Sequence, residues 1–201
     1  MRRDAVLESL RHAVGPDDIV VAVYQTLFDW MAICPRDLNY VATGAMGQAS
    51  SHGLGLALAN PERRVLVLDG DGSLLMNLGS LATVADAAPG NFLHMVFVNG
   101  TYEVNGAHPT PAAGRMDFAA AARAAGYARA ARWRRLAEFR DQHAEFMAGQ
   151  GPALAELAIE PGRSYPHDYR YIHSPEARDR FRRALNSKAA MPAEGKPGTD
   201  R

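Results

Sequence analysis

An acid and an amide, Asp71 and Asn99, each stand directly after an apolar run of the sequence. Asp71 lies in a glycine-rich turn after residues 65–69, and Asn99 follows residues 93–98. Short apolar runs of this kind are typical of parallel strands buried on both faces, and the carboxyl ends of such strands meet at one edge of a sheet. Mg²⁺ that carries a diphosphate prefers one or two protein oxygens together with phosphate and water oxygens. The pattern therefore predicts a magnesium–diphosphate site.

The residues around this pair resemble the diphosphate-binding domain of thiamine diphosphate-dependent decarboxylases. In that family a Gly-Asp-Gly-Ser element is followed further along the chain by an Asn that shares the metal. The matching residues here are Gly70, Asp71, Gly72, Ser73 and Asn99. The resemblance implies that Asp71 and Asn99 bind Mg²⁺ through their side chains and that Thr101 binds it through its backbone carbonyl. Val98 stands where the family usually has a second Asn.

Further segments carry the same resemblance, from about residue 38 to residue 162. Residues 43–51 look like the Gly-Ser-Met-Gly segment of decarboxylases that act on phosphonopyruvate and sulfopyruvate, and residues 99–103 and 106–110 fall where those enzymes have similar stretches. The resemblance implies that Met46 is an apolar wedge beneath the bent cofactor, and that the carbonyl of Gly44 accepts a hydrogen bond from the pyrimidine amine. The remaining implied cofactor contacts are Ala45 and Tyr102.

Two segments depart from the family pattern. His108 stands where the family more often has Gln, so it is a candidate for contact with an anionic substrate or for proton transfer, and a solvent-facing loop histidine is the alternative. Residues 24–30 replace a segment with Gly, Ser or Thr, and Arg-Glu, and only Thr26 remains to reach a phosphate. The roles of His108 and of this loop therefore stay open.

The family activates its cofactor with a glutamate from a separate pyrimidine-binding domain, which this chain does not show. The resemblance therefore implies one subunit of a split decarboxylase that acts on a small 2-oxo acid, such as the beta subunit of sulfopyruvate decarboxylase. The implied partner is a pyrimidine-domain subunit, in an α2β2 or larger hetero-oligomer. Two alternatives remain: a split carboligase or acyl-transferring enzyme, and an inactive cofactor-binding or regulatory subunit. The sequence does not name the substrate or the partner.

Bulk properties narrow the class of protein. The chain has 201 residues, 47% hydrophobic and 22% charged, with a formal net charge of zero. Such a balance gives no reason to expect a nucleic acid or membrane partner. Cys34 is the single cysteine, which excludes an internal disulfide or a cysteine-ligated cluster within these residues. With no apolar secretory segment at residues 1–14, we expect a cytoplasmic protein.

The elements that must position these residues alternate between strand and helix. The expected strands cover residues 19–23, 39–42, 65–69, 93–98, 127–131 and 153–159. The expected helices cover residues 4–14, 26–33, 48–60, 74–88, 117–125, 135–148 and 174–186. This alternation predicts an α/β fold with a doubly wound, mostly parallel sheet and helices on both faces. We expect one domain over residues 1–185 and a disordered tail over residues 186–201.

Several residues also have purely structural interpretations. Asp71 and Asn99 could be ordinary turn residues at strand ends. Ser73 could cap the helix expected over residues 74–88, whose free amides would face the diphosphate. Gly53 and Gly55 weaken a helix interior, so they predict close packing of that helix. His52 and His94 are expected to be packed structural residues.

Overall fold

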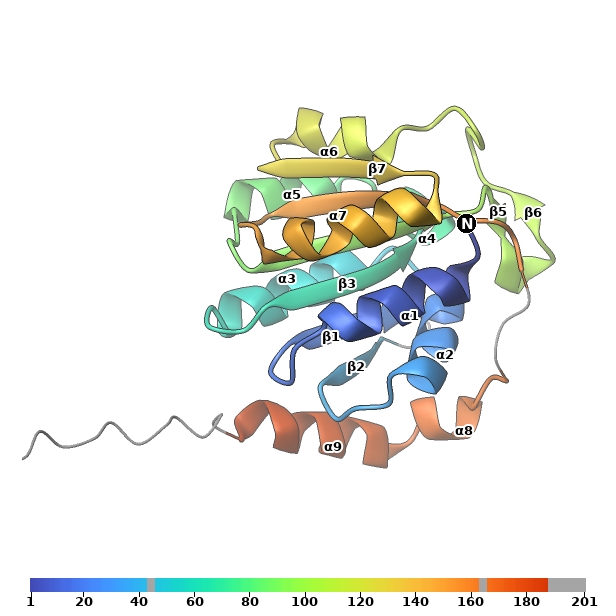
Figure 1. The fold of residues 1–201 in the computed structure, drawn as a ribbon. Coiled ribbons are helices and arrows are strands. Elements are labelled where there is room, and N and C mark those ends of the chain that lie inside the picture. Colours follow the sequence, from blue (N-terminus) through green and yellow to red (C-terminus); the bar gives the residue numbers. More distant parts are fainter. Residues whose placement is uncertain (43–45, 163–165, 188–201) are drawn as a thin grey trace, which may run out of the picture.

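A six-stranded sheet with the order β2-β1-β3-β4-β8-β7 forms the centre of the computed structural model, which describes residues 1–42, 46–162 and 166–187 (Figure 1). Every neighbouring pair in this sheet is parallel. The strands are β1 Ile19–Val23, β2 Asn39–Ala42, β3 Val65–Gly70, β4 Phe92–Val98, β7 Arg129–Trp133 and β8 Ala153–Ala158. The predicted doubly wound sheet is therefore confirmed.

Helices cover both faces of this sheet, as Figure 1 shows. One face packs against α1 Arg3–Ala13, α2 Tyr24–Ile33 and α7 Leu136–Ala148. The other face packs against α3 Ala49–Ala59, α4 Asp71–Leu75, α5 Ser80–Ala87 and α6 Phe118–Ala125. Beyond the β2 edge lie α8 Tyr169–Ile172 and α9 Pro175–Asn186. The central strands β1, β3, β4 and β8 are almost wholly buried, which explains their continuous apolar runs.

The prediction of one continuous helix over residues 74–88 is wrong. The chain forms the short helix α4 first and starts α5 only at Ser80. Between them the backbone is tightened by i→i+3 hydrogen bonds, such as the one from Met76 N to Ser73 O (3.1 Å). The side chain of Asn77 turns back to donate to the carbonyl of Gly47 (3.0 Å). These bonds divert the chain, so that α4 stays at the strand end while α5 packs on the sheet.

Ser73 does not cap a helix, because α4 already begins at Asp71. The Ser73 hydroxyl instead accepts a hydrogen bond from the N–H of Gly47 (3.1 Å). This bond ties the turn after β2 to the turn after β3.

The strand predicted over residues 127–131 lies two residues later, as β7. The preceding helix α6 is capped by Asp117, which accepts from the N–H of Ala120 (2.7 Å), as expected. The helix ends at Gly126, whose φ of 108° is in the left-handed region, and the N–H of Tyr127 still bonds to Ala122 O. Because this helix-ending arrangement occupies Tyr127, the strand begins only after it.

The predicted close packing of α3 holds for one of its two glycines. A Cβ at Gly53 would lie 2.3 Å from Val67 Cγ2 and 3.0 Å from Phe92 Cε2, whereas a Cβ at Gly55 would meet nothing within 4 Å. Gly53 therefore lets α3 approach the sheet, and the prediction is wrong for Gly55.

The long connection after β4 contains a small antiparallel hairpin. It consists of β5 Thr101–Tyr102, the turn η1 Glu103–Asn105 and β6 His108–Pro109. Within the described part of the chain, no helix combines the length and the apolar character needed to cross a bilayer. The predicted tail lies outside the described residues from residue 188 onward.

Candidate cofactor site

The candidate site lies between the neighbouring strands β1 and β3, at the point where the chain leaves the two strands in opposite directions along the sheet. From β1 the chain runs through α2 to β2 on one side, and from β3 it runs through α4 and α5 to β4 on the other. In a doubly wound sheet this topology opens a crevice outside the carboxyl ends of the strands, which is where ligands bind. A pocket occupies this position, and it is lined by eight of the predicted residues: Met46, Gly70, Asp71, Gly72, Ser73, Asn99, Thr101 and Tyr102.

Asp71 is held at this edge by the backbone of the next strand end. Its side chain is buried, and Oδ2 accepts a hydrogen bond from the N–H of Gly100 (2.8 Å). Burial raises the pKa of Asp71 above its ordinary value, and the backbone N–H groups of Gly100, Gly72 and Asn99 offset part of that rise. A buried carboxylate of this kind is stabilised by a divalent cation placed against it.

Asn99 and Thr101 form a tight turn beside Asp71. The Oδ1 atom of Asn99 accepts from the N–H of Thr101 (2.8 Å) and from its hydroxyl (3.3 Å). Asn99 is thus a turn residue at a strand end, which is the structural interpretation considered for it from the sequence. The turn also fixes the direction of the Asn99 oxygen. The nearby donors are therefore carboxylate, amide and carbonyl oxygens, a set that suits Mg²⁺ rather than a metal bound through sulfur or imidazole.

Gly72 is required by the ring of Tyr102. A Cβ at residue 72 would lie 2.5 Å from Tyr102 Cε1 and 2.6 Å from Cδ1, with Thr110 Cγ2 at 3.3 Å. The hairpin after β4 therefore packs directly on the turn after β3. The backbone of this turn stays open toward the pocket because no side chain stands at Gly72.

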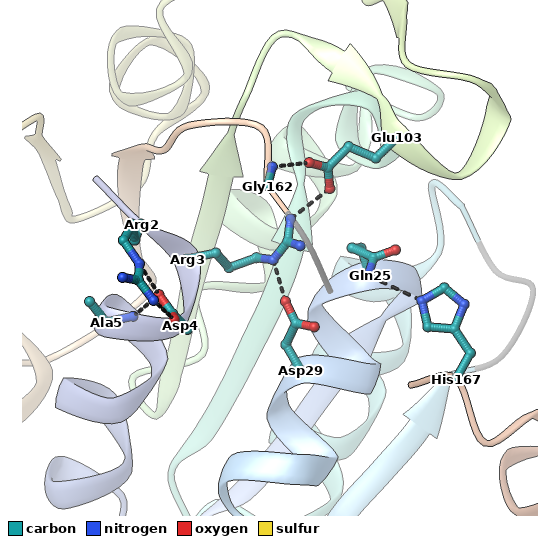
Figure 2. A network of polar contacts seen from close by, with 9 residues as sticks. All are labelled: Arg2, Arg3, Asp4, Ala5, Gln25, Asp29, Glu103, Gly162 and His167. Carbon is teal, nitrogen blue, oxygen red and sulfur yellow. Dashed lines mark hydrogen bonds and ion pairs between the residues drawn. The ribbon is translucent and has the colours of Figure 1, made fainter. Parts of the chain in front are cut away.

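The segment that departs from the family pattern forms the beginning of α2, and its residues Tyr24, Gln25 and Thr26 also line the pocket. Tyr24 has a φ of 46°, a left-handed conformation that favours glycine and that clusters at functional sites. Thr26 is buried. Gln25 Nε2 lies 3.2 Å from Nε2 of His167 (Figure 2). The ring of His167 also stacks on Phe28, with 4.1 Å between the ring centroids.

A buried ion cluster at the side of the pocket was not predicted. The guanidinium of Arg3 donates from Nε to Oδ2 of Asp29 and from Nη1 to Oε2 of Glu103 (2.6 Å), as Figure 2 shows. Glu103 Oε1 also accepts from the N–H of Gly162 (3.0 Å). The sequence carries one signal for this cluster. Arg3 falls on the helix face of Val6, Leu7 and Leu10, where a charged residue is unusual.

The remaining predicted residues lie elsewhere. His108 is exposed on β6 and is not among the described residues that line the pocket, so the structure does not bring it to the site. Gly44 and Ala45 lie outside the described residues. His94 is fully buried with its Nε2 3.2 Å from Asp69 Oδ2, and the ring of His52 contacts Tyr40, so both are packed residues as expected.

Comparison with known proteins relates this chain to one family. The sequence profile described as "Thiamine pyrophosphate enzyme, C-terminal TPP binding domain" matches residues 22–157. A phosphonopyruvate decarboxylase from Streptomyces viridochromogenes is 41% identical over 161 residues, which are 80% of this chain and 40% of the relative. The sulfopyruvate decarboxylase subunit beta of Methanothermobacter thermautotrophicus is 40% identical over 128 residues, which are 63% of this chain and 64% of the relative.

Solved structures show the same fold. A Mycobacterium smegmatis protein described as a thiamin diphosphate-dependent enzyme superposes with a TM-score of 0.68 at 20% identity, over 81% of this chain and 32% of its own. The chain thus spans well under half the length of that protein and of the Streptomyces relative.

Proposed function

The chain belongs to the family of the thiamine pyrophosphate enzyme C-terminal TPP binding domain, and on this premise we propose that it binds the diphosphate and Mg²⁺ of a thiamine diphosphate-dependent 2-oxo acid decarboxylase. The observation that carries the proposal is the gathering of Asp71, Asn99 and Thr101 around one pocket at the switch point of the sheet. The substrate would be of the sulfopyruvate or phosphonopyruvate type, because the relatives carry those names at about 40% identity.

The residues present fit such a cofactor. Asp71 offers a buried carboxylate whose pKa is raised by burial, and the amide oxygen of Asn99 and the carbonyl of Thr101 complete an oxygen donor set for Mg²⁺. The backbone at Gly72 would lie against the diphosphate, and Met46 would pack against the cofactor rings. When bound, thiamine diphosphate supplies an electron sink that allows a 2-oxo acid to lose carbon dioxide.

This chain's own contribution is binding and orientation. Asp71 is fixed by Gly100, and Asn99 is fixed by Thr101, so the metal ligands are held before the ligand arrives. The ring of Tyr102 packs against the turn at Gly72 and helps to hold that turn in place. Two carboxylates are found among the described residues that line the pocket. Asp71 is a proposed metal ligand and Glu103 forms an ion pair with Arg3, and we assign a proton transfer to neither.

We propose that a separate pyrimidine-domain subunit completes the active site. Support comes from the relatives named "subunit beta", whose matches cover 63% and 54% of this chain. The proposed assembly is a hetero-oligomer of α2β2 or larger size, and its proposed compartment is the cytoplasm.

The test is a reconstitution. The purified chain should bind thiamine diphosphate only in the presence of Mg²⁺, and it should release carbon dioxide from sulfopyruvate or phosphonopyruvate only after a pyrimidine-domain subunit is added. Full turnover by the single chain would contradict the need for a partner, and absence of Mg²⁺-dependent binding would contradict the cofactor assignment. Analysis of the products distinguishes decarboxylation from carboligation, and an assembled complex that binds cofactor without turnover would indicate the regulatory alternative.

A further inference from the structure

The buried guanidinium of Arg3 has a donor that no described residue uses. The side chain is only 5% exposed, and it lines the same pocket as Asp71 and Asn99. Its Nε and Nη1 atoms are taken by Asp29 and Glu103, while Nη2 is buried without a hydrogen-bond partner. Figure 2 shows this third nitrogen on the side of the guanidinium that faces Gln25, another pocket residue. Leaving a buried charged donor unpaired costs free energy, so its position needs an explanation.

Arg3 remains charged in this setting. Burial lowers the pKa of its guanidinium, but the adjacent carboxylates of Asp29 and Glu103 outweigh burial and leave the pKa above its ordinary value. The same two carboxylates fix the plane of the guanidinium, because each accepts from a different nitrogen. A fixed planar cation with free N–H bonds is suited to an oxygen of a phosphate or carboxylate.

The pocket gives this donor a specific position. Among the described residues that line it, Arg3 is the only cation. The beginning of α2 contributes Tyr24, Gln25 and Thr26, none of which is charged. The same pocket is lined by the turn at Gly72 and by the metal-ligand candidates. An anionic group in this pocket would therefore meet both oxygen ligands for a metal and a guanidinium among the residues that line it.

We propose that Arg3 is an additional cofactor-binding residue, whose Nη2 donates to a phosphate oxygen of the diphosphate. This inference rests on the proposed function and adds a residue from α1, before the first strand, to the site. Asp29 and Glu103 are then positioning residues, since their carboxylates hold the guanidinium.

The test measures binding of Mg²⁺–pyrophosphate to the full-length purified chain by isothermal titration calorimetry and by the shift in melting temperature. Arg3→Gln should weaken binding about tenfold to a hundredfold, the range expected for one charge-assisted hydrogen bond. Arg3→Lys keeps a cation between the two carboxylates but has no third nitrogen, so it should fold and still bind more weakly than the wild type. Arg2→Gln is the matched control, because Arg2 is exposed and pairs with Asp4.

A purely structural Arg3 would give a different result. Its variants would then melt at a lower temperature without ligand but keep the wild-type affinity for Mg²⁺–pyrophosphate. That outcome in Arg3→Lys overturns the inference, while loss of binding in Asp71→Ala alone leaves the proposed function standing. If the wild type does not bind Mg²⁺–pyrophosphate at all, the proposed function and this inference both fail.

Discussion

Asp71 and Gly100, which belong to the ends of two different strands, are joined by a hydrogen bond of 2.8 Å from the Gly100 N–H to the Asp71 carboxylate. The two strands, β3 and β4, are paired in parallel up to Gly70 and Phe97, so their ends are already side by side. The bond therefore fixes the carboxylate relative to Asn99, the residue before Gly100. The candidate metal site is built into the protein rather than assembled by the ligand.

Replacing Asp71 with Ala should abolish Mg²⁺-dependent binding of thiamine diphosphate, because no other carboxylate among the predicted metal ligands can replace it. Isothermal titration calorimetry with and without Mg²⁺ measures this directly. Asp86→Ala is the control, since Asp86 is exposed on α5. Unchanged binding in Asp71→Ala would refute the metal assignment.

Asp71 should also make the free energy of unfolding of the metal-free protein depend on pH. Because burial raises the pKa of Asp71, the folded protein binds a proton more tightly than the unfolded chain does. As pH rises from about 3.8, the ordinary value, through the raised pKa, the contribution of this group to the free energy of unfolding falls. Above the raised pKa the loss is complete.

Asp71→Asn should therefore melt at a higher temperature than the wild type at neutral pH in the presence of a chelator, and it should lack this part of the pH dependence. Excess Mg²⁺ should raise the melting temperature of the wild type and leave the variant unchanged. A variant that is less stable than the wild type in chelator would show that the carboxylate is not a source of instability.

The two glycines of α3 provide a matched pair of substitutions. Gly53→Ala should destabilise the protein by about 1–3 kcal/mol, because its methyl group would overlap Val67 in the core. Gly55→Ala should stabilise it by about 0.5–1 kcal/mol, because that site is exposed and helical. Urea denaturation of both variants measures the difference, and equal effects would contradict the packing described for α3.

Gly72 and Tyr102 should be coupled energetically. Gly72→Ala should cost about 1–3 kcal/mol, since its methyl group would displace the Tyr102 ring. In a Tyr102→Ala background the same substitution should cost much less, and a double-mutant cycle reports the difference as an interaction free energy. Additive effects would mean that the ring does not restrict residue 72.

Breaking the ion pair between Arg3 and Asp29 should strongly destabilise the folded protein. Asp29→Ala should reduce the free energy of unfolding by about 3–5 kcal/mol, because it leaves the Arg3 cation buried with one carboxylate fewer. Glu138→Ala, which breaks the exposed pair with Arg135, should cause no measurable change. Chemical denaturation of the two variants compares a buried with an exposed ion pair, and a small effect of Asp29→Ala would argue that solvent reaches the cluster.

The sequence was most informative where local pattern and topology agree. Parallel strands buried on both faces produce continuous apolar runs, and a parallel sheet gathers the residues that follow those runs at one edge. Asp71 and Asn99 could therefore be placed together without a structure. The capped helix beginning after Asp117 is a local feature of the same kind, because its signal lies within one turn.

Features that depend on tertiary contacts could not be predicted in this way. The break between α4 and α5 depends on Asn77 reaching the carbonyl of Gly47, 30 positions earlier. The pairing of Arg3 with Glu103 spans 100 positions. Periodicity can indicate that Arg3 faces the core, but the identity of its partners follows only from the assembled sheet. For the same reason the different roles of Gly53 and Gly55 are not visible in the helix pattern.

Glu103 accepts from Arg3, 100 positions before it, and from Gly162, 59 positions after it. One wall of the pocket thus needs nearly the whole domain to be in place, and no early segment of the chain can form it alone. We expect this wall to form late in folding, because contacts between distant positions require the loops between them to close first.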